Sequence, residues 1–399
     1  MKLVKSLFLG SVAGLAAAAG AQAADLPAKK AAAVEYVRVC STYGAGFFYI
    51  PGTETCLRVG GRVRAEYLYN EPLERNDDSI GFLARGRVQL DARTATAYGL
   101  LRTFVRLEIT RSTGVYNGFD GGITSSAQAA QAFIQFGGLT AGRAPSFFVN
   151  SDIPNENWGT IRFYDFPDVN LLAYTFTFGN GFSASISLEE GTSATEQLGG
   201  YGQRLPDVVG NLKYSGTWGS AQLSGALHQL RSNVAVGGDF ADSEYGWAVS
   251  AQANVNLPML AEGDALWIAA TYADGALGYL GFDPEVSAGT AAGTVLDAYI
   301  RANGDINTGA GWSVAGGLNH FWTPTIRQSV FGSYARVTYS ADAPVAEFAE
   351  WRVGSNLIWS PVSGLDIGVE ALYSNLDPRG ALLRGDDTWE GRLRIQRDF

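Results

Sequence analysis

The sequence predicts an all-β protein, a transmembrane antiparallel β-barrel of sixteen strands. First, residues 388–399 alternate between a largely apolar face and a strongly charged face, as a strand with lipid on one side and water on the other must. Second, glycine (50 residues) and aromatic residues (12%) are abundant while methionine is rare, which favours short strands and turns over helices. Third, beyond the N-terminal residues no stretch approaches the roughly 18 apolar residues that a spanning helix needs.

The chain begins with the features of a secretory signal. Lys2 and Lys5 precede an apolar stretch at residues 7–19, which ends in the small-residue pattern of residues 21–23. We therefore expect a signal peptide at residues 1–23, an N-terminal lead-in and disulfide loop at residues 24–56, and the barrel at residues 57–399. The net charge of −10 lacks the basic footprint that nucleic-acid binding requires.

Cys40 and Cys56 are the two cysteines, and they lie close together in a chain that is expected to be exported. That setting favours a disulfide, which would close a small loop before the first strong strand and stabilise it by roughly 3 kcal/mol. The alternative is a pair of buried free thiols. The spacing does not fit a C-x2-C metal site and further ligands are not evident, so no metal or cofactor is predicted.

Residues 57–69, 84–93 and 101–110 show the clearest strand pattern. In each of them apolar side chains share one face, and arginine and acidic side chains share the other. Charged residues at every second position over three neighbouring strands are too many for the buried core of a soluble sandwich. The remaining strands are predicted at residues 131–136, 139–143, 171–178, 182–190, 208–214, 221–231, 245–256, 266–272, 312–321, 326–339, 348–359, 365–373 and 388–399.

Topology limits the number of strands. A barrel with both ends in the periplasm needs an even count, with short turns alternating with long loops. Residues 295–302 look strand-like, but counting them would place a long connection on the short-turn side. We therefore assign residues 276–311 to one long outer loop, which leaves sixteen strands, with fourteen and eighteen as the neighbouring alternatives. Aromatic residues near the strand ends fit girdles at the membrane interfaces; a soluble sandwich core is the alternative.

A barrel of this size encloses a water-filled lumen. Closure brings the last strand beside the first, which predicts a basic ladder on one side of the pore: Arg58, Arg62, Arg64, Arg85, Arg87, Arg102, Arg106, Arg392 and Arg394. The competing interpretation pairs these arginines with Glu66, Asp91, Glu108 and Glu390 for solubility of the wall. Both can hold, because the arginines outnumber these acids.

Residues 144–170 form an unusually long connection that is rich in aromatic residues and carries four acids: Asp152, Glu156, Asp165 and Asp168. If this connection folds inward, its carboxylates face the arginines across the lumen. The resulting transverse field would favour polar solutes, which can orient their dipoles as they pass. The alternative is an external surface loop.

Several motifs carry a resemblance to a known family. The run from Cys40 to Cys56 followed by LRVGGR, the segments HFWTP at residues 320–324 and SVFGSY at residues 329–334, and the terminal RIQRDF resemble general porins of alphaproteobacteria. The resemblance covers nearly the whole mature chain. It implies a homotrimer of sixteen-stranded barrels, each with an infolded third loop to which the four acids correspond by position. It also implies that Phe399 is the terminal aromatic residue by which assembly machinery recognises such barrels.

The functional hypothesis is an outer-membrane channel for passive diffusion of small hydrophilic solutes and ions, with both termini in the periplasm. Its expected partners are further copies of the chain, membrane lipid and lipopolysaccharide, and the solutes themselves. A substrate-selective channel for anionic or sugar solutes is the alternative. The arginine ladder allows a mild anion preference, and the net acidity argues the other way.

An outer-membrane enzyme is the rival from a different class. Such an enzyme needs a nucleophile with a positioned base, and the chain has two histidines, His228 and His320. His228 has no adjacent acid in its strand, and His320 lies beside a short turn and is interpreted as structural. No catalytic residue is therefore predicted.

Overall fold

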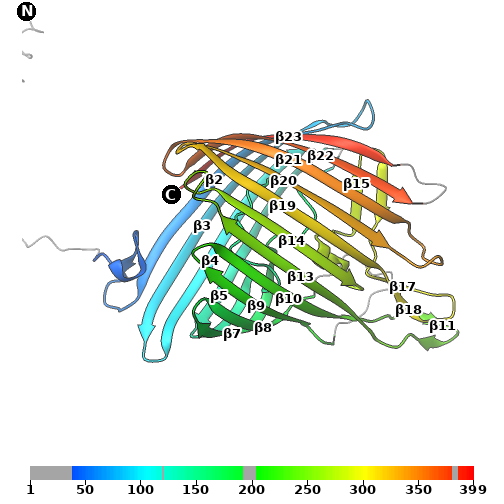
Figure 1. Cartoon of the computed structure of the whole chain (residues 1–399), viewed down its shortest axis with the longest axis horizontal. Coiled ribbons are helices and arrows are strands. Elements are labelled where there is room, and N and C mark those ends of the chain that lie inside the picture. The colour runs from blue at the N-terminus through cyan, green and yellow to red at the C-terminus, as the bar shows by residue number, and fades with distance from the viewer. Residues whose placement is uncertain (1–37, 119–120, 192–203, 380–384) are drawn as a thin grey trace, which may run out of the picture.

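The computed structural model describes residues 38–118, 121–191, 204–379 and 385–399. The expected signal peptide at residues 1–23 lies outside these residues. Sixteen antiparallel strands close into a barrel, which confirms the predicted fold and strand count (Figure 1). They are β2 (Cys56–Asn70), β3 (Ile80–Thr96), β4 (Gly99–Gly114), β5 (Ile123–Phe136), β6 (Leu139–Pro145), β7 (Asp168–Gly179), β8 (Phe182–Glu189), β9 (Asp207–Gly216), β10 (Gly219–Leu230), β13 (Glu244–Asn256), β14 (Ala265–Asp274), β19 (Ala310–Thr323), β20 (Ile326–Thr338), β21 (Glu347–Val362), β22 (Leu365–Arg379) and β23 (Asp386–Asp398).

The barrel closes where the last strand pairs with the first. The register of β23 on β2 runs from Arg62 opposite Asp398 to Asn70 opposite Glu390. The terminal residue continues this seam, because the backbone amides of Gly61 and Phe399 each donate to the carbonyl oxygen of the other, at 2.9 and 3.0 Å. A side chain at position 61 would collide with the ring of Phe399, so the seam requires glycine there. The predicted closure is confirmed.

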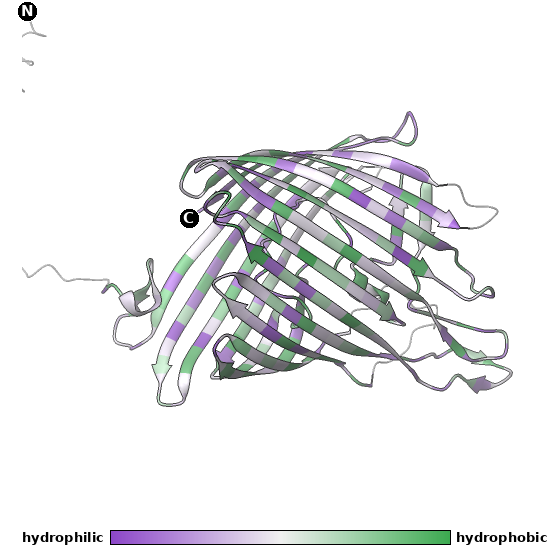
Figure 2. Cartoon of the chain, in the orientation of Figure 1, coloured by the Kyte–Doolittle hydropathy of each residue, from purple (hydrophilic) through white to green (hydrophobic). Residues whose placement is uncertain are grey.

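The strands alternate between apolar and polar residues along their length, as Figure 2 shows. In β13, Trp247 and Val249 are exposed on the outer face, whereas Ser250 and Gln252 point inward and are buried. This period of two is what a wall between lipid and an internal polar space requires. Within the described residues, no helix has the length and apolar character to cross a membrane.

Aromatic side chains gather on the outer face toward the end of the barrel that carries the long connections. Neighbouring strands contribute rings whose centroids lie 4.9 to 5.3 Å apart: Tyr67–Phe82, Trp247–Tyr272, Trp312–Tyr334, Trp351–Tyr373 and Tyr373–Trp389. Such cross-strand pairs stabilise a sheet and suit the boundary between hydrocarbon and headgroups. The band corresponds to one of the two predicted girdles.

The connection between β14 and β19 is a packed structure, which we call the outer cap (residues 275–309). It contains the 3-10 helix η3 (Leu277–Leu280) and the short strands β15 (Glu285–Ala288), β16 (Ala291–Thr294), β17 (Ala298–Ile300) and β18 (Ile306–Thr308). Its apolar residues, including Leu280 and Leu296, join Phe148 and Tyr164 in one buried cluster. The segment was expected to be a long outer loop with local strand structure. It is a folded cap that packs against Phe148 and Tyr164 of the connection between β6 and β7.

Cys40 and Cys56 form the predicted disulfide. The loop it closes contains η2 (Ser41–Tyr43) and β1 (Phe48–Tyr49), which pairs with β2. The guanidinium groups of Arg58 and Arg93 lie 5.9 and 4.9 Å from the ring centroid of Phe47. These contacts attach the disulfide loop to the end of the barrel that carries the short turns.

Candidate constriction of the lumen

The connection between β6 and β7, residues 146–167, lies inside the barrel. The backbone amide of Asn150 donates to the Gln252 side chain of β13 at 2.7 Å. Farther along, the amide of Trp158 donates to the carboxylate of Glu370 on β22 at 2.8 Å. Both acceptors are on the inner face of the wall, so the connection crosses the lumen from β13 to β22. We call it the inner loop; its position confirms the expected infolding.

A buried ion cluster fastens the middle of the inner loop. Arg162 pairs through two guanidinium nitrogens with the carboxylate of Glu350 on β21, and Arg352 donates to the same carboxylate at 2.7 Å. Arg162 also donates to the carbonyl oxygen of Gly281 in the outer cap at 3.0 Å. Its own backbone amide donates to the hydroxyl of Ser333 at 2.9 Å. Arg162 therefore joins the inner loop, the wall and the outer cap.

All arginines of the predicted ladder lie on β2, β3, β4 and β23, which are neighbours in the closed sheet. We call the inner face of these four strands the arginine wall. It carries Arg58, Arg62, Arg64, Arg85, Arg87, Arg102, Arg106, Arg392 and Arg394.

The four acids suggested as partners do form ion pairs on this wall. Glu66 pairs with Arg394, Asp91 with Arg93 and Arg102, Glu108 with Arg87, and Glu390 with Arg392. Arg62 pairs with Asp398, with nitrogen–oxygen distances of 2.5 and 3.1 Å, whereas Arg64 has the Gln396 amide oxygen at 3.3 Å as its hydrogen-bond acceptor. Both interpretations of the ladder therefore hold in part.

Two acids of the inner loop pair with basic residues outside the ladder. Asp152 forms an ion pair with Lys213 at 2.9 Å and accepts a hydrogen bond from Ser215 at 2.7 Å. Burial disfavours the charged form of Asp152, but these contacts outweigh it and lower the pKa of the carboxyl. Glu156 lies 3.4 Å from Arg327 of β20.

The other two acids have neutral partners. Asp165 accepts from the Asn155 side chain at 2.8 Å. Asp168 is the first residue of β7, beyond the inner loop, and accepts from Gln131 at 2.7 Å. Across the described contacts, the four acids are therefore spread around the lumen instead of forming one row opposite the arginines.

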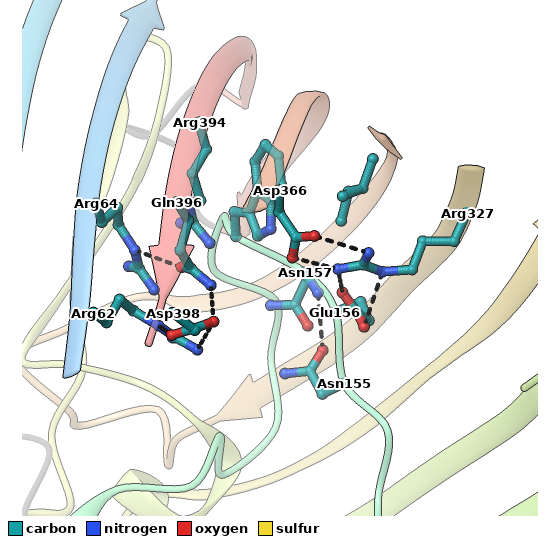
Figure 3. A pocket seen from close by; sticks show the side chains of 12 residues that line it. Arg62, Arg64, Asn155, Glu156, Asn157, Arg327, Asp366, Arg394, Gln396 and Asp398 are labelled. Atoms are coloured by element: carbon teal, nitrogen blue, oxygen red, sulfur yellow. Dashed lines mark hydrogen bonds and ion pairs between the residues drawn. The ribbon is translucent and has the colours of Figure 1, made fainter. Parts of the chain in front are cut away.

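Two cavities lie between the inner loop and the wall. The smaller, the tip chamber, has a volume of about 360 Å³ and lies beside residues 155–158. Figure 3 shows Arg62, Arg64, Gln396 and Asp398 on one side of it and Arg327 with Asp366 on the other. Its lining contains four arginines and three carboxylates, so its charges nearly balance.

The larger cavity, the arginine chamber, has a volume of about 730 Å³. It lies between β2–β5, β9 and the first half of the inner loop. Its ionisable lining residues are Arg58, Arg93, Arg102, Arg106 and Lys213 against the one acid Asp91. The remaining polar lining is mostly amide and hydroxyl side chains from residues such as Gln131, Gln135 and Ser151. This chamber therefore concentrates positive charge.

The residues that hold the inner loop were not predicted from the sequence: Lys213, Arg327, Glu350, Arg352 and Glu370, together with Asp366, which pairs with Arg327. Each occupies an inward position of a strand that was predicted. Extending the alternation of charged and apolar residues from the first three strands to β9 and β20–β22 would have identified them. What that alternation could not give is which segment of the inner loop each of them contacts.

His228 has no acidic residue in its own strand β10, but strand pairing brings one beside it. Its Nδ1 lies 2.7 Å from Asp207 on the adjacent strand β9, and Tyr279 of the outer cap donates to the same carboxylate at 2.7 Å. All three side chains are fully buried, so this cluster packs the cap against the wall. His320 contacts Asp264 at 2.6 Å beside a short turn, which agrees with a structural role.

Comparisons with known proteins agree on one family. Residues 25–391 match the porin subfamily. The chain is 32% identical to the porin Omp2a of Brucella suis, over 99% of this chain and all of that one. It is 33% identical to the porin Omp2b of Brucella neotomae, over 99% of each.

Solved structures share the fold at lower sequence identity. The outer membrane channel DcaP of Acinetobacter baumannii superposes with a TM-score of 0.66 at 17% identity, over 88% of this chain and 99% of that one. OprB of Pseudomonas putida gives a TM-score of 0.51 at 12% identity, over 86% and 94% of the two chains.

Proposed function

The chain belongs to the porin subfamily, and we propose that it forms a water-filled channel through which small hydrophilic solutes and ions diffuse passively across the outer membrane. Its relatives over essentially the whole length are named porins. We further propose that the short turns and both termini face the periplasm and that the outer cap faces the cell exterior.

One observation carries this function. The barrel has an apolar outer face, yet its interior holds two polar chambers between the wall and the inner loop. A barrel that served as a scaffold alone would have no need of arginines lining internal cavities. Charged and amide side chains around an internal space instead replace part of the hydration of a passing ion or solute.

We assign the arginine wall and the inner-loop acids to permeation. The arginines make one side of the lumen positive, and Asp152 and Glu156 reduce that charge where the inner loop meets Lys213 and Arg327. Because these acids are dispersed, we expect a weak ion selectivity without a single strong cation site.

The assembly we propose is a homotrimer, as the family resemblance implies. Small exposed residues on the outer face of β3 and β5, Ala84, Gly86, Ala127 and Ala129, would let strands of neighbouring barrels approach closely within the membrane. Lipid and lipopolysaccharide would then cover the remaining apolar face, and Phe399 would serve as the terminal assembly signal.

Single-channel recording in planar bilayers tests the channel directly. Purified full-length mature protein should give ohmic conductance steps in KCl. The steps should persist when uncharged sugars are added at micromolar concentration, since diffusion without a dedicated carrier site does not saturate in that range. The absence of steps, or complete block by micromolar amounts of one solute, would contradict a general diffusion channel.

A further inference from the structure

Arg106 is the feature of the lumen that the proposed function leaves unexplained. It projects from β4 into the arginine chamber, and its Nε is buried without a hydrogen-bond acceptor. One face of its guanidinium is covered by the ring of Phe104, whose centroid lies 5.7 Å away. Asp168 and Glu108 interact with it electrostatically, but no hydrogen bond joins Arg106 to any described residue.

The desolvation of a buried guanidinium nitrogen is normally offset by a hydrogen bond. The Nε atoms of Arg336, Arg352 and Arg392 are also buried without an acceptor. What distinguishes Arg106 is its place in the arginine chamber. The neighbouring residues show that acceptors were available to other arginines. Arg102, four residues away on the same strand, donates to both oxygens of Asp91 and to the amide oxygen of Gln135. The terminal nitrogens of Arg106 also have no hydrogen-bond acceptor among the described residues and, unlike its Nε, are not among the buried atoms, so they are the donors that an incoming solute can use.

The rest of the chamber holds more positive charge than its one lining carboxylate can cancel. Asp91 is shared by Arg93 and Arg102, so one carboxylate serves two guanidinium groups. The guanidinium of Arg58 lies near the Phe47 ring and forms no ion pair in the described part of the chain. Lys213 is balanced by Asp152. After these pairs are counted, an excess positive charge remains at Arg58, at Arg106 and at the Asp91 cluster.

We propose that the arginine chamber is a binding subsite for small oxyanions, that is, solutes with a carboxylate or phosphate group, which Arg106 engages directly and Arg58 attracts. A guanidinium presents paired N–H donors that match the oxygens of such groups. Gln131, Gln135 and Ser151 of the lining can donate to further oxygens. This proposal rests on the proposed channel, since the solute reaches the chamber through the lumen.

Inorganic phosphate is a suitable probe, measured as block of chloride current through single channels at pH 7 and constant ionic strength. The wild-type channel should show a concentration-dependent fall in current at millimolar phosphate. Arg106→Gln should raise the half-blocking concentration about tenfold, since a hydrogen bond to a charged group is lost. Arg111→Gln is the matched control: it removes the same charge from the same strand, but at a position exposed on the outer face.

The outcomes separate the two proposals. A protein that forms no channels in KCl overturns the channel itself. Channels whose current phosphate leaves unchanged, or in which R106Q and R111Q shift the block equally, overturn the subsite alone. If R106Q does not assemble, R106K and R58Q answer the same question, because each should weaken the phosphate block. R106K loses the planar guanidinium with its paired N–H donors, and R58Q loses a positive charge that attracts the anion.

Acetate tests whether the subsite binds carboxylates as well as phosphates. If the subsite recognises the carboxylate as well as the phosphate group, acetate produces a weaker block that R106Q relieves in the same proportion. An acetate block that is insensitive to R106Q would overturn the carboxylate part of the proposal.

Discussion

The two sides of the barrel interior differ in what their polar residues do. On the arginine wall, charged side chains line the chambers. On the opposite side, β10 and β13 carry an equally polar inner face, which we call the neutral wall: Ser220, Gln222, Ser224, Ser250, Gln252 and Asn254. All six are buried. A polar inner face is thus not the same as a pore lining, because part of it holds the inner loop.

The chemistry of the residues explains this division. Neutral amides and hydroxyls offer donors and acceptors to the loop backbone without the penalty of burying a charge. Gln252 both accepts from the amide of Asn150 and donates to the carbonyl oxygen of Phe148 at 3.0 Å. Arginines, in contrast, remain favourable beside water. The first half of the inner loop therefore packs against the neutral wall, and buried ion pairs and carboxylates of β21 and β22 hold its second half. The arginine wall is left to line the two chambers.

Removing Arg162 should have the largest effect on this division. Arg162→Met deprives the fully buried carboxylate of Glu350 of its two-nitrogen partner, at a cost of about 3 kcal/mol. Hydrogen exchange of residues 146–167 should accelerate roughly a hundredfold, and single-channel current should become larger and noisier.

The double variant Arg162→Met with Glu350→Gln provides the control. It removes both charges of the pair, and an amide oxygen at position 350 can still accept from Arg352, so part of the protection should be restored. Unchanged exchange in the single variant would show that the cluster does not fasten the inner loop.

A matched pair of glutamine substitutions compares the two walls, and its expected effect on the inner loop is smaller than that of Arg162→Met. Gln222 donates to Ser224 and to the carbonyl oxygens of Phe147 and Phe148. Gln222→Glu places an acceptor against acceptors and should destabilise the docked loop by about 1–3 kcal/mol. Gln89→Glu makes the same change on the arginine wall and should leave the amide hydrogen exchange of the inner loop unchanged. Equal acceleration of exchange in both variants would contradict the division between the walls.

The smallest expected effect concerns ion selectivity. Arg64→Gln removes a cation from the tip chamber that has no carboxylate partner among the described residues. A unit charge about 10 Å from a passing ion in water contributes about 0.4 kcal/mol, so the permeability ratio should shift about twofold toward cations. The reversal potential in a dilute KCl gradient measures this shift, which should shrink as salt increases. The amide hydrogen exchange of the inner loop should not change. If it does, Arg64 has a structural role.

The sequence predicts the strands and their closure well, because a period of two leaves a signal in every strand and the seam follows from circular topology. It also identifies Glu66, Asp91, Glu108 and Glu390 as partners of the ladder, since partners on neighbouring strands follow from register. Glu156 and Arg327 meet across the lumen, 171 residues apart in sequence, and no local pattern indicates that contact. Likewise, His228 and Asp207 become neighbours through strand pairing, although neither lies next to the other in the chain.

The seam between β2 and β23 has a consequence for how the protein reaches its folded state. The Arg62–Asp398 pair joins residues 336 positions apart, so this contact forms after nearly the whole chain has been ordered. Until then both strands have an edge of unpaired backbone groups, which hydrocarbon does not tolerate and which other chains can pair with. Insertion into the membrane and ring closure must therefore proceed together. Once the ring is closed, no strand can leave without reopening an edge inside the lipid, which makes the assembled barrel kinetically persistent.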